Sequence, residues 1–319
     1  MSPAAPTLTV AIATYNGREL LENVLSSLDA QSFRDFDVLV VDDCSSDGTA
    51  EWLAEQRPEV RLISHAVNRG VTAALNTGLA SSEAELTMLL NNDMELDSAC
   101  LGELVAAMRA HPEAGSAVGK LLSYYDRTVL DGAGDTFIWA GLGWRRGHGE
   151  WDVGQYETPQ AIFGACGGAA VYRRSAVGLV GPFDEDFFAF YEDVDWSFRA
   201  QLAGLGCRYV PTAVAYHMGS ATLGKGETDF TRYHTWRNSI WLVLKDYPAP
   251  LLLWHLPRVL ANQVQCLLVA GRARKLALLL RVWRDAALAF PEIARKRRAV
   301  QRTRRVTLAQ LQAAVRDQR

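Results

Sequence analysis

The chain begins its first regular element with LTVAIATYN at residues 8–16, an apolar run followed at once by polar side chains. The apolar part, residues 8–13, predicts a buried β-strand. Leu and Val then recur at helical spacing between Leu20 and Leu28, and residues 37–41 return to a β-branched run. A strand, a helix and a second strand in this order are typical of a parallel βαβ unit. These residues therefore predict an α/β fold with a mainly parallel sheet.

The alternation of strand and helix patterns continues along the chain. It loosens between residues 132 and 160, which are rich in Gly and aromatic residues and have no clean period. Loops or hairpins are expected there, and beyond Thr228 the pattern is helical to the end. The remaining predicted helices are 51–56, 71–80, 97–111 and 194–205, and the remaining predicted strands are 61–64, 86–90, 207–210 and 213–217.

Polar clusters follow the first two predicted strands, TYN at residues 14–16 and DDCSSDGT at residues 42–49. Ligands of open parallel sheets bind at the carboxyl ends of the strands. The adjacent carboxylates Asp42 and Asp43 are costly to bury unless they bind something, and a nucleotide base or ribose suits them. The alternative is that this segment only caps the following helix with its Ser and Asp residues.

Two more clusters end later strands, NRG at residues 68–70 together with Asn76, and NND at residues 91–93. A diphosphate leaving group gathers negative charge as its bond to a sugar breaks. An Arg and a divalent cation with oxygen ligands would neutralise that charge. Asp93 is the natural cation ligand, although a single Asp after a strand is more often a turn residue.

Taken in order, these clusters resemble the hallmarks of family 2 glycosyltransferases over residues 8–247. The resemblance is strongest to bacterial rhamnosyltransferase-like members that build cell-wall or surface polysaccharide. It implies the GT-A fold, a Rossmann-like nucleotide-diphospho-sugar transferase domain. The matching segments are AIATYN (11–16), VVDD (40–43), SSDGT (45–49), NRG (68–70), LLNND (89–93), GACGGA (164–169), FYEDVDW (190–196), VPTA (210–213) with His217, and Arg237-Asn238.

The resemblance implies a donor site for a nucleoside diphosphate sugar, with dTDP-rhamnose or a UDP-sugar as the first candidates. Asp42 and Asp43 would contact base and ribose, Thr14 and Tyr15 would line the base pocket, and Arg69 would approach base or diphosphate. The donor-side residues are then Thr14, Tyr15, Asn16, Asp42, Asp43, Asn68, Arg69, Gly70, Asn76 and Asn92.

The resemblance also implies a divalent metal, Mg²⁺ or Mn²⁺, held by Asp93 and by His217. The family's D-x-D motif is here Asn91-Asn92-Asp93, with a single carboxylate. The loss of one carboxylate predicts a lower metal affinity than in the family at large. A single His at the end of a strand is otherwise more often structural.

The pair Glu192 and Asp193 resembles the family's acceptor-activating motif, in which the second acid is the catalytic base. An acceptor hydroxyl is a poor nucleophile, and a nearby carboxylate can take its proton. The family mechanism implies a single displacement with inversion onto a glycan or lipid-linked acceptor. Gly167, Gly168 and Trp196 are expected on the acceptor side, with residues 132–160 as its wall. The alternative for Asp193 is a helix cap.

Two other functions stay open at this point. A sugar-nucleotide nucleotidyltransferase shares the βαβ nucleotide site, but usually has a Gly-rich loop with a basic residue after the first strand, where this chain has TYNGR at residues 14–18. A non-catalytic nucleotide-sugar-binding assembly subunit is the second alternative. Asp93, Asp193 and His217 argue against it.

Charge is divided unevenly along the 319 residues, whose net charge is -3. Residues 258–319 contain 15 Lys and Arg against 3 acids, or +12, which leaves -15 for residues 1–257. We therefore expect a glycosyltransferase domain at 1–247 and a basic helical tail at 248–319. Such a tail favours an anionic partner. Residues 1–9 lack a signal-peptide pattern, which predicts a cytoplasmic protein.

The tail has an amphipathic segment but no apolar run long enough to span a bilayer. An interfacial helix would hold the enzyme peripherally on the inner face of the membrane. The alternative is that this helix packs on the catalytic domain. Nucleic acid is not expected as a partner, because the aromatic residues are not interleaved with the arginines. The predicted apolar face consists of Leu276, Leu279, Leu280, Trp283, Ala287 and Phe290.

Overall fold

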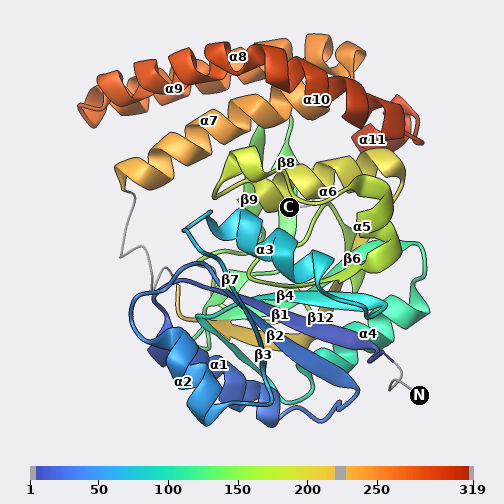
Figure 1. Ribbon diagram of the computed structural model, residues 1–319. Coiled ribbons are helices and arrows are strands. Elements are labelled where there is room, and N and C mark those ends of the chain that lie inside the picture. Colours follow the sequence, from blue (N-terminus) through green and yellow to red (C-terminus); the bar gives the residue numbers. More distant parts are fainter. Residues whose placement is uncertain (1–4, 220–227, 316–319) are drawn as a thin grey trace.

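A ten-stranded mixed sheet organises the chain in the computed structural model, which describes residues 5–219 and 228–315. The strands run in the order β10-β12-β6-β11-β4-β1-β2-β3, with β5 paired to β12 and β7 to β6. Figure 1 shows helices on both sides of this sheet and a helical layer above it. The strands of this sheet are β1 (Leu8–Thr14), β2 (Phe36–Asp42), β3 (Arg61–Ser64), β4 (Leu86–Asn91), β5 (Met94–Leu96), β6 (Ala114–Ser123), β7 (Leu130–Gly132), β10 (Gln160–Ile162), β11 (Ala169–Arg173) and β12 (Gly206–His217).

The N-terminal half is the predicted parallel arrangement. β1 pairs in parallel with β2 and β4, and β2 with β3. In this register Thr14 lies opposite Asp42, and Ala13 lies opposite Asn91. The carboxyl ends of three strands therefore meet at one edge, as the βαβ pattern predicted. The crossover helices are α1 (Arg18–Asp29), α2 (Thr49–Gln56) and α3 (Val71–Ala80).

Beyond β4 the sheet becomes mixed. β11 runs antiparallel between β4 and β6, whereas β12 runs parallel to β6. The two short strands predicted at 207–210 and 213–217 are one strand, β12, with a shift of register between Val210 and Val214. The shift surrounds Pro211, which has no N–H to donate to a sheet ladder. The helices on this half are α4 (Cys100–Ala110), α5 (Arg174–Val180), the short 3-10 helix η1 (Glu185–Phe187) and α6 (Glu192–Ala203).

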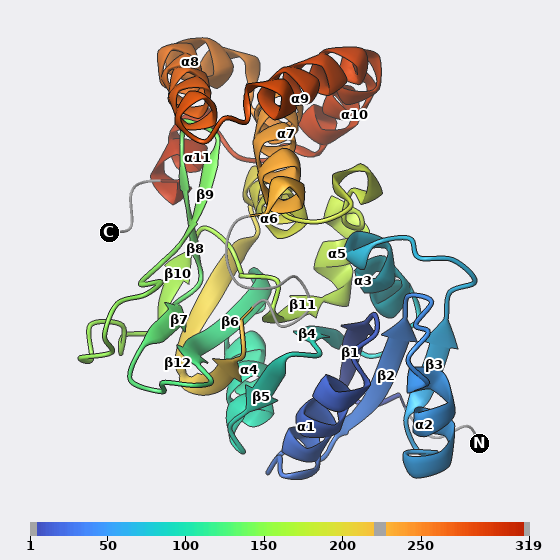
Figure 2. The same ribbon diagram turned by 90° about the vertical axis from the view of Figure 1, so that its left-hand side faces the viewer.

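The segment without a clean period contains a hairpin of its own, β8 (Asp135–Ile138) and β9 (Leu142–Arg145). Figure 2 shows this hairpin rising from the sheet to the helical layer. At its turn the Trp139 ring stacks on His255 of the layer, with ring centroids 4.5 Å apart. The hairpin therefore joins the sheet to the C-terminal helices.

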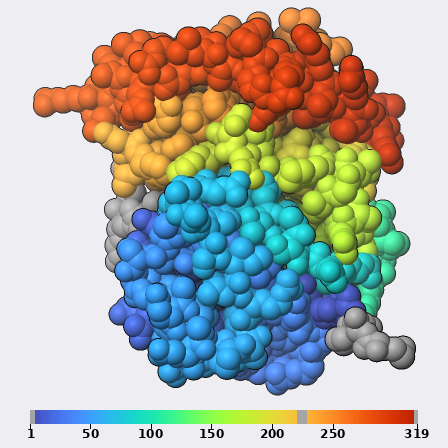
Figure 3. All heavy atoms as spheres, in the orientation of Figure 1, coloured from blue at the N-terminus to red at the C-terminus, as the bar shows by residue number. Residues whose placement is uncertain are grey.

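The tail packs against the rest of the chain as a layer (Figures 1 and 3). Lys296 of the tail donates to Asp184, and Lys245, near the end of the predicted domain, pairs with Asp184 at 2.7 Å and with Asp195 at 2.5 Å. Residues 316–319 of the predicted tail, and residues 1–4 and 220–227 of the predicted domain, lie outside the described residues. The helices of the layer are α7 (Asp229–Asp246), α8 (Ala249–Arg272), α9 (Leu276–Leu288), α10 (Phe290–Thr303) and α11 (Leu308–Ala314).

The predicted apolar face of α9 is divided in the structure. Leu279 is only 1% exposed and Trp283 donates its indole N–H to Gln263 of α8, so both face the protein. Leu276, Leu280 and Phe290 are exposed. Helix packing within the layer therefore buries part of the predicted face and leaves the rest at the surface, so neither alternative describes the whole face. Within residues 5–219 and 228–315, no helix is long and apolar enough to cross a membrane.

Candidate active site

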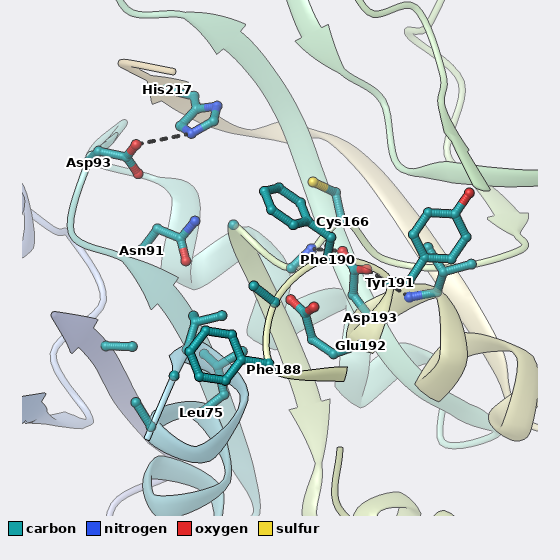
Figure 4. A pocket seen from close by; sticks show the side chains of 18 of the residues that line it. Leu75, Asn91, Asp93, Cys166, Phe188, Phe190, Tyr191, Glu192, Asp193 and His217 are labelled. Atoms are coloured by element: carbon teal, nitrogen blue, oxygen red, sulfur yellow. Dashed lines mark hydrogen bonds and ion pairs between the residues drawn. The ribbon is translucent and has the colours of Figure 1, made fainter. Parts of the chain in front are cut away.

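A cavity of about 710 Å³ opens at the carboxyl ends of the parallel strands, between them and the first turn of α6. Figure 4 shows residues of this cavity, with Asp93 and His217 on one side and Glu192 and Asp193 on another. The structure thus brings together side chains that lie far apart in the sequence. The sequence-predicted residues that line it are Thr14, Tyr15, Asp43, Asn68, Gly70, Asn92, Asp93, Gly167, Gly168, Glu192, Asp193 and His217.

Five predicted site residues do not line this cavity. Asn16 accepts from the Ser46 amide and Asp42 from Ser45, so both organise neighbouring loops. Arg69 pairs with an exposed Glu185, and Asn76 exchanges hydrogen bonds with the Phe183 backbone.

Trp196 is fully buried and donates its indole N–H to the Gly181 carbonyl. Its ring packs edge-on against Tyr172. The expectation of an acceptor-side Trp196 is corrected, because the side chain belongs to the core beneath α6.

Asp43 organises the loop at residues 68–70. Its carboxylate accepts from the backbone amides of Arg69 at 2.9 Å and Gly70 at 2.8 Å, and from the His65 imidazole at 2.7 Å. The two adjacent carboxylates at the end of β2 therefore stabilise different segments. Asp43 fixes the loop that borders the cavity, and Asp42 fixes the turn after β2.

Asp93 and His217 meet because of a strand pairing. β5 begins directly after Asp93 and runs antiparallel to the end of β12, with Met94 opposite His217. The imidazole Nε2 lies 3.4 Å from Asp93 Oδ2. Asp93 Oδ1 is buried and has no hydrogen-bond partner in the described parts of the chain. An unpartnered carboxylate oxygen beside an imidazole suits a hard divalent cation.

Few protein ligands are available for such a cation. Among the residues that the structure describes, no group of three or more His, Cys, Asp or Glu side chains is arranged to hold a metal ion. A cation at Asp93 and His217 would complete its coordination with diphosphate oxygens and water, as Mg²⁺ commonly does.

Sequence reasoning missed Asp131, which lies in β7 behind His217. Asp131 Oδ2 accepts from His217 Nδ1 at 2.9 Å and from the Arg145 guanidinium at 2.6 Å. Burial lowers the pKa of His217, but the hydrogen bonds and charges of Asp131 and Asp93 outweigh it and raise that pKa to about 9. A cation bound at Nε2 would therefore have to displace the proton from that nitrogen. The only signal in the sequence was the pair of acids in DGAGD at residues 131–135.

Asp193 sits in the first turn of α6 with both oxygens bonded to backbone amides. Oδ2 accepts from Gly167 at 2.9 Å and Oδ1 from Val194 at 2.8 Å. The N-cap of α6 is Tyr191, and its side chain makes no cap hydrogen bond. A side chain at Gly167 would place its Cβ 3.2 Å from Asp193 Oδ2, so the Gly-rich run lets the backbone reach the carboxylate.

The cavity beside Asp193 contains two further acids. Burial raises the pKa of Glu192, and the charges of Asp193 and Asp195 add to the rise. Burial and the charge of Asp193 likewise raise the pKa of Asp135 well above its ordinary value. Burial thus favours the protonated form of both acids, in which a carboxyl group can donate a hydrogen bond to an oxygen-rich ligand.

The hairpin region contributes Asp131, Asp135, Trp144 and Arg145 to the cavity lining. Trp144 is largely exposed at the rim, where a flat apolar ring can stack on a sugar. Sequence analysis expected a wall here and did not identify its residues.

Comparisons with known proteins agree on one family. The sequence model of "Glycosyl transferase family 2" matches residues 9–180. An N-acetylglucosaminyl-diphospho-decaprenol L-rhamnosyltransferase of Mycobacterium tuberculosis is 29% identical over 305 residues, covering 85% of this chain and 97% of the relative.

Two solved structures share the fold. The mannosyltransferase PcManGT of Pyrobaculum calidifontis, in complex with GDP-Man and Mn²⁺, has a TM-score of 0.55 at 20% identity and covers 99% of this chain and 88% of its own. GalNAc-T7 with UDP, GalNAc and Mn²⁺ has a TM-score of 0.61 at 16% identity and covers 76% and 48%.

Proposed function

Since the chain belongs to glycosyl transferase family 2 and is a glycosyltransferase with the GT-A fold, we propose that it transfers one sugar from a nucleoside diphosphate to a hydroxyl of a glycan or lipid-linked acceptor. One observation carries this proposal. A single cavity of about 710 Å³ holds the Asp43-ordered loop, the Asp93–His217 pair and the Asp193 carboxylate. These are a donor site, a site for leaving-group charge and a base.

Donor binding rests on the strand ends. The base of the donor nucleotide lies against Thr14 and Tyr15, which line the cavity beside the loop that Asp43 fixes. Asp93 and His217 would hold a divalent cation against the diphosphate, and that cation would supply the charge that stabilises the leaving group. The Asp93 oxygen without a hydrogen-bond partner fits this role.

Acceptor activation rests on Asp193. Its carboxylate takes the proton of the acceptor hydroxyl as that oxygen attacks the sugar carbon opposite the diphosphate. A single displacement of this kind inverts the configuration at that carbon. Glu192 and Asp135, kept neutral by burial, orient the acceptor by hydrogen bonds.

For the sugar and the acceptor, the Mycobacterium tuberculosis relative supplies the starting point, since its name describes an L-rhamnosyltransferase acting on a diphospho-decaprenol lipid. We therefore propose dTDP-rhamnose, then UDP-linked hexoses, as donors and a lipid-linked sugar as acceptor.

A membrane partner is supported by helix α8, which turns its apolar side outward. The polar side chains of His255 and Asn262 face the protein, and Asn262 donates to the Ala140 carbonyl of the hairpin turn. Leu253 and Trp254, by contrast, are 72% and 74% exposed. An exposed apolar stripe of this size marks an interaction surface. The exposed apolar residues of α8 at helical spacing are Leu253, Trp254, Leu260, Val264 and Leu268.

We propose that this α8 stripe inserts at the headgroup level of an anionic membrane, peripherally on the cytoplasmic face. Residues 258–319 carry a net charge of +12, which complements such a surface. The hairpin beneath α8 continues to Trp144 and Arg145 in the cavity lining, so a lipid-linked acceptor would reach the site from that side.

The deciding experiment incubates the full chain with a panel of nucleotide sugars and a short-chain N-acetylglucosaminyl diphosphate lipid, with Mn²⁺ or with EDTA. Transfer with inverted anomeric configuration is expected with Mn²⁺ and is expected to vanish in EDTA. Full transfer in EDTA would overturn the cation role. Binding without turnover would indicate a non-catalytic subunit, and formation of a nucleotide sugar from a nucleoside triphosphate and a sugar phosphate would indicate a nucleotidyltransferase.

A further inference from the structure

Residues 187–191, which precede the proposed catalytic base Asp193, have an unusual backbone conformation. Phe188 has φ 63° and ψ −53°, and the amide of Ala189 donates to the Phe187 carbonyl at 2.7 Å. This is the strained form of the γ-turn, which is rare for residues with a side chain. Phe190 and Tyr191 also have positive φ, at 63° and 70°. Such strain persists only where the surrounding structure enforces it.

Both ends of this segment, residues 187–191, lie at the reaction site. The Phe188 ring lies against Gly70, where an added Cβ would be 2.7 Å from the ring. At the other end, Tyr191 directly precedes Glu192 and Asp193 in the first turn of α6. The conformation of five residues therefore sets the spacing between the donor loop and the proposed base.

Asn238 of α7 holds the segment from below. Its side-chain amide is fully buried and donates from Nδ2 to the carbonyls of Phe187 at 3.1 Å, Ala189 at 2.9 Å and Phe190 at 2.7 Å. These carbonyls flank the strained residues. A side chain that only filled core space would not need three such bonds.

Arg237 orients that amide. Its Nε donates to Asn238 Oδ1 at 2.9 Å, which turns Nδ2 toward the carbonyls. Its Nη2 donates to the carbonyls of Asp186 at 2.9 Å and Phe187 at 3.1 Å. The guanidinium also lies over the Trp241 ring, 4.1 Å from its centroid. The Arg237-Asn238 pair thus makes four hydrogen bonds to residues 187–191 and a fifth to the adjoining Asp186.

We propose that Arg237 and Asn238 are positioning residues for transfer: they hold residues 187–191 in the strained conformation that aims Asp193 at the acceptor and seats Phe188 on the donor loop. The inference rests on the proposed role of Asp193 as the base. Neither residue lines the cavity, so the pair would act on kcat through the segment.

The test compares Asn238→Ala, Asn238→Asp, Arg237→Lys and a matched control, Ser239→Ala. Ser239 is buried next to Asn238 on the same helix and bonds only to the Trp236 carbonyl. Each full-length variant is assayed for kcat and KM with dTDP-rhamnose and the short-chain lipid acceptor, for dTDP affinity and for Tm.

Asn238→Ala is expected to lower kcat about 10²-fold, because a displacement of about 1 Å at the reacting centre has that effect, while dTDP affinity stays within about threefold. Asn238→Asp is expected to be worse, since a carboxylate oxygen would face three carbonyl oxygens. Arg237→Lys is expected to be intermediate, because the amide keeps its bonds but loses its orienting partner.

Two results would overturn the inference. One is a fall in Tm for the Asn238 and Arg237 variants with kcat near that of Ser239→Ala, which would make the pair ordinary core residues. The other is an equal loss of kcat and dTDP affinity. Asp193→Asn, assayed in parallel, separates this failure from that of the proposed function. If Asp193→Asn is active, Asp193 is not the base and the proposed function is wrong in that point. If Asp193→Asn is inactive and the Asn238 variants are active, only the positioning role is refuted.

Discussion

At the residue scale, the proposed role of Asp193 as the base requires lone pairs that the fold leaves unused. Each carboxylate oxygen accepts one backbone amide, from Gly167 or Val194, and so retains a lone pair for the acceptor proton. Asp193→Asn keeps the size of the side chain and removes the base. We expect kcat to fall by roughly 10² to 10⁴ with donor affinity nearly unchanged, measured by steady-state kinetics and dTDP titration.

Glu192→Gln serves as the comparison for that variant. Because burial keeps Glu192 neutral, an amide of the same shape can replace most of its hydrogen bonding. Its loss of kcat should be much smaller than that of Asp193→Asn. If Asp193→Asn keeps a turnover near that of the wild type, Asp193 is excluded as the base.

Also at the residue scale, Asp131 sets the direction in which His217 presents Nε2. A carboxylate behind an imidazole fixes the ring and makes it a better ligand, and removing such a partner typically weakens metal binding about 10-fold to 100-fold. We therefore expect Asp131→Asn to weaken Mn²⁺ binding by about that factor. Titration of Mn²⁺ in the presence of dTDP, followed by electron paramagnetic resonance, measures this without any turnover.

The matched control is Asp126→Asn, an exposed acid of the neighbouring turn whose carboxylate, among the described residues, bonds only to Thr128. Equal Mn²⁺ affinity in the two variants would show that His217 needs no support from Asp131.

Local sequence predicted the residues that follow strands and missed those that depend on tertiary pairing. Asp43, Asp93 and His217 line the cavity because strand ends in parallel sheets converge, and this is visible in the sequence. Trp196 could not be placed correctly, because the rotation of about 100° between neighbouring helix residues decides whether a side chain faces the cavity or the core. Asp131 lies in a short strand without periodicity, so only its contact with His217 reveals it.

At the element scale, the proposal that the exposed apolar stripe of α8 binds lipid can be tested by substitution within the stripe. Trp254→Glu combined with Leu260→Glu places two charges where headgroups and acyl chains would meet. Each lost apolar side chain is worth about 1.5 to 3 kcal/mol of burial, so sedimentation with anionic vesicles should fall by well over tenfold. Neutral vesicles should bind both proteins weakly.

Val153→Glu provides the control, because Val153 is an exposed apolar residue on a loop outside α8. If the α8 variant binds vesicles as the wild type does, the stripe does not bind lipid. If the variant instead loses a concentration-dependent dimer, the partner of the stripe is a second copy of the chain.

The two tail helices also show where helical periodicity stops being informative. Both α8 and α9 have apolar residues at helical spacing, but periodicity gives the width of a stripe and not the direction it faces. The indole of Trp283 bonds to Gln263, whereas Trp254 points away from the protein. Only the packing of the layer separates an inward stripe from an outward one. The early βαβ units were predictable because a parallel sheet buries both faces of its strands.

At the scale of the whole molecule, ion pairs attach the C-terminal helical layer, α7 to α11, to the rest of the chain. Asp184, just before η1, pairs with Lys245 of α7 and Lys296 of α10. The Arg297 side chain also donates to the Leu244 carbonyl, and Gln301 donates to that of Asp246. These bonds join α10 to α7, whose Arg237 and Asn238 are hydrogen-bonded to the segment before Asp193. The layer therefore supports the site as well as presenting α8.

The stability that the ion pairs of Asp184 contribute depends on pH. Burial raises the pKa of Asp184, but Lys245 and Lys296 outweigh burial and lower it from the ordinary 3.8 to about 2. A depressed carboxyl pKa stabilises the folded state fully above the unfolded value, and this contribution disappears as pH falls from about 4 to about 2. Asp184→Asn should therefore lower the free energy of unfolding at pH 7 by about 2 kcal/mol, and the gap to wild type should close toward pH 2. Glu292→Gln, which removes an exposed pair with Arg295 on α10, is the control and should show little change. Denaturant unfolding at a series of pH values measures the gap, and a constant difference down to pH 2 would mean that Asp184 contributes through packing and not through its charge.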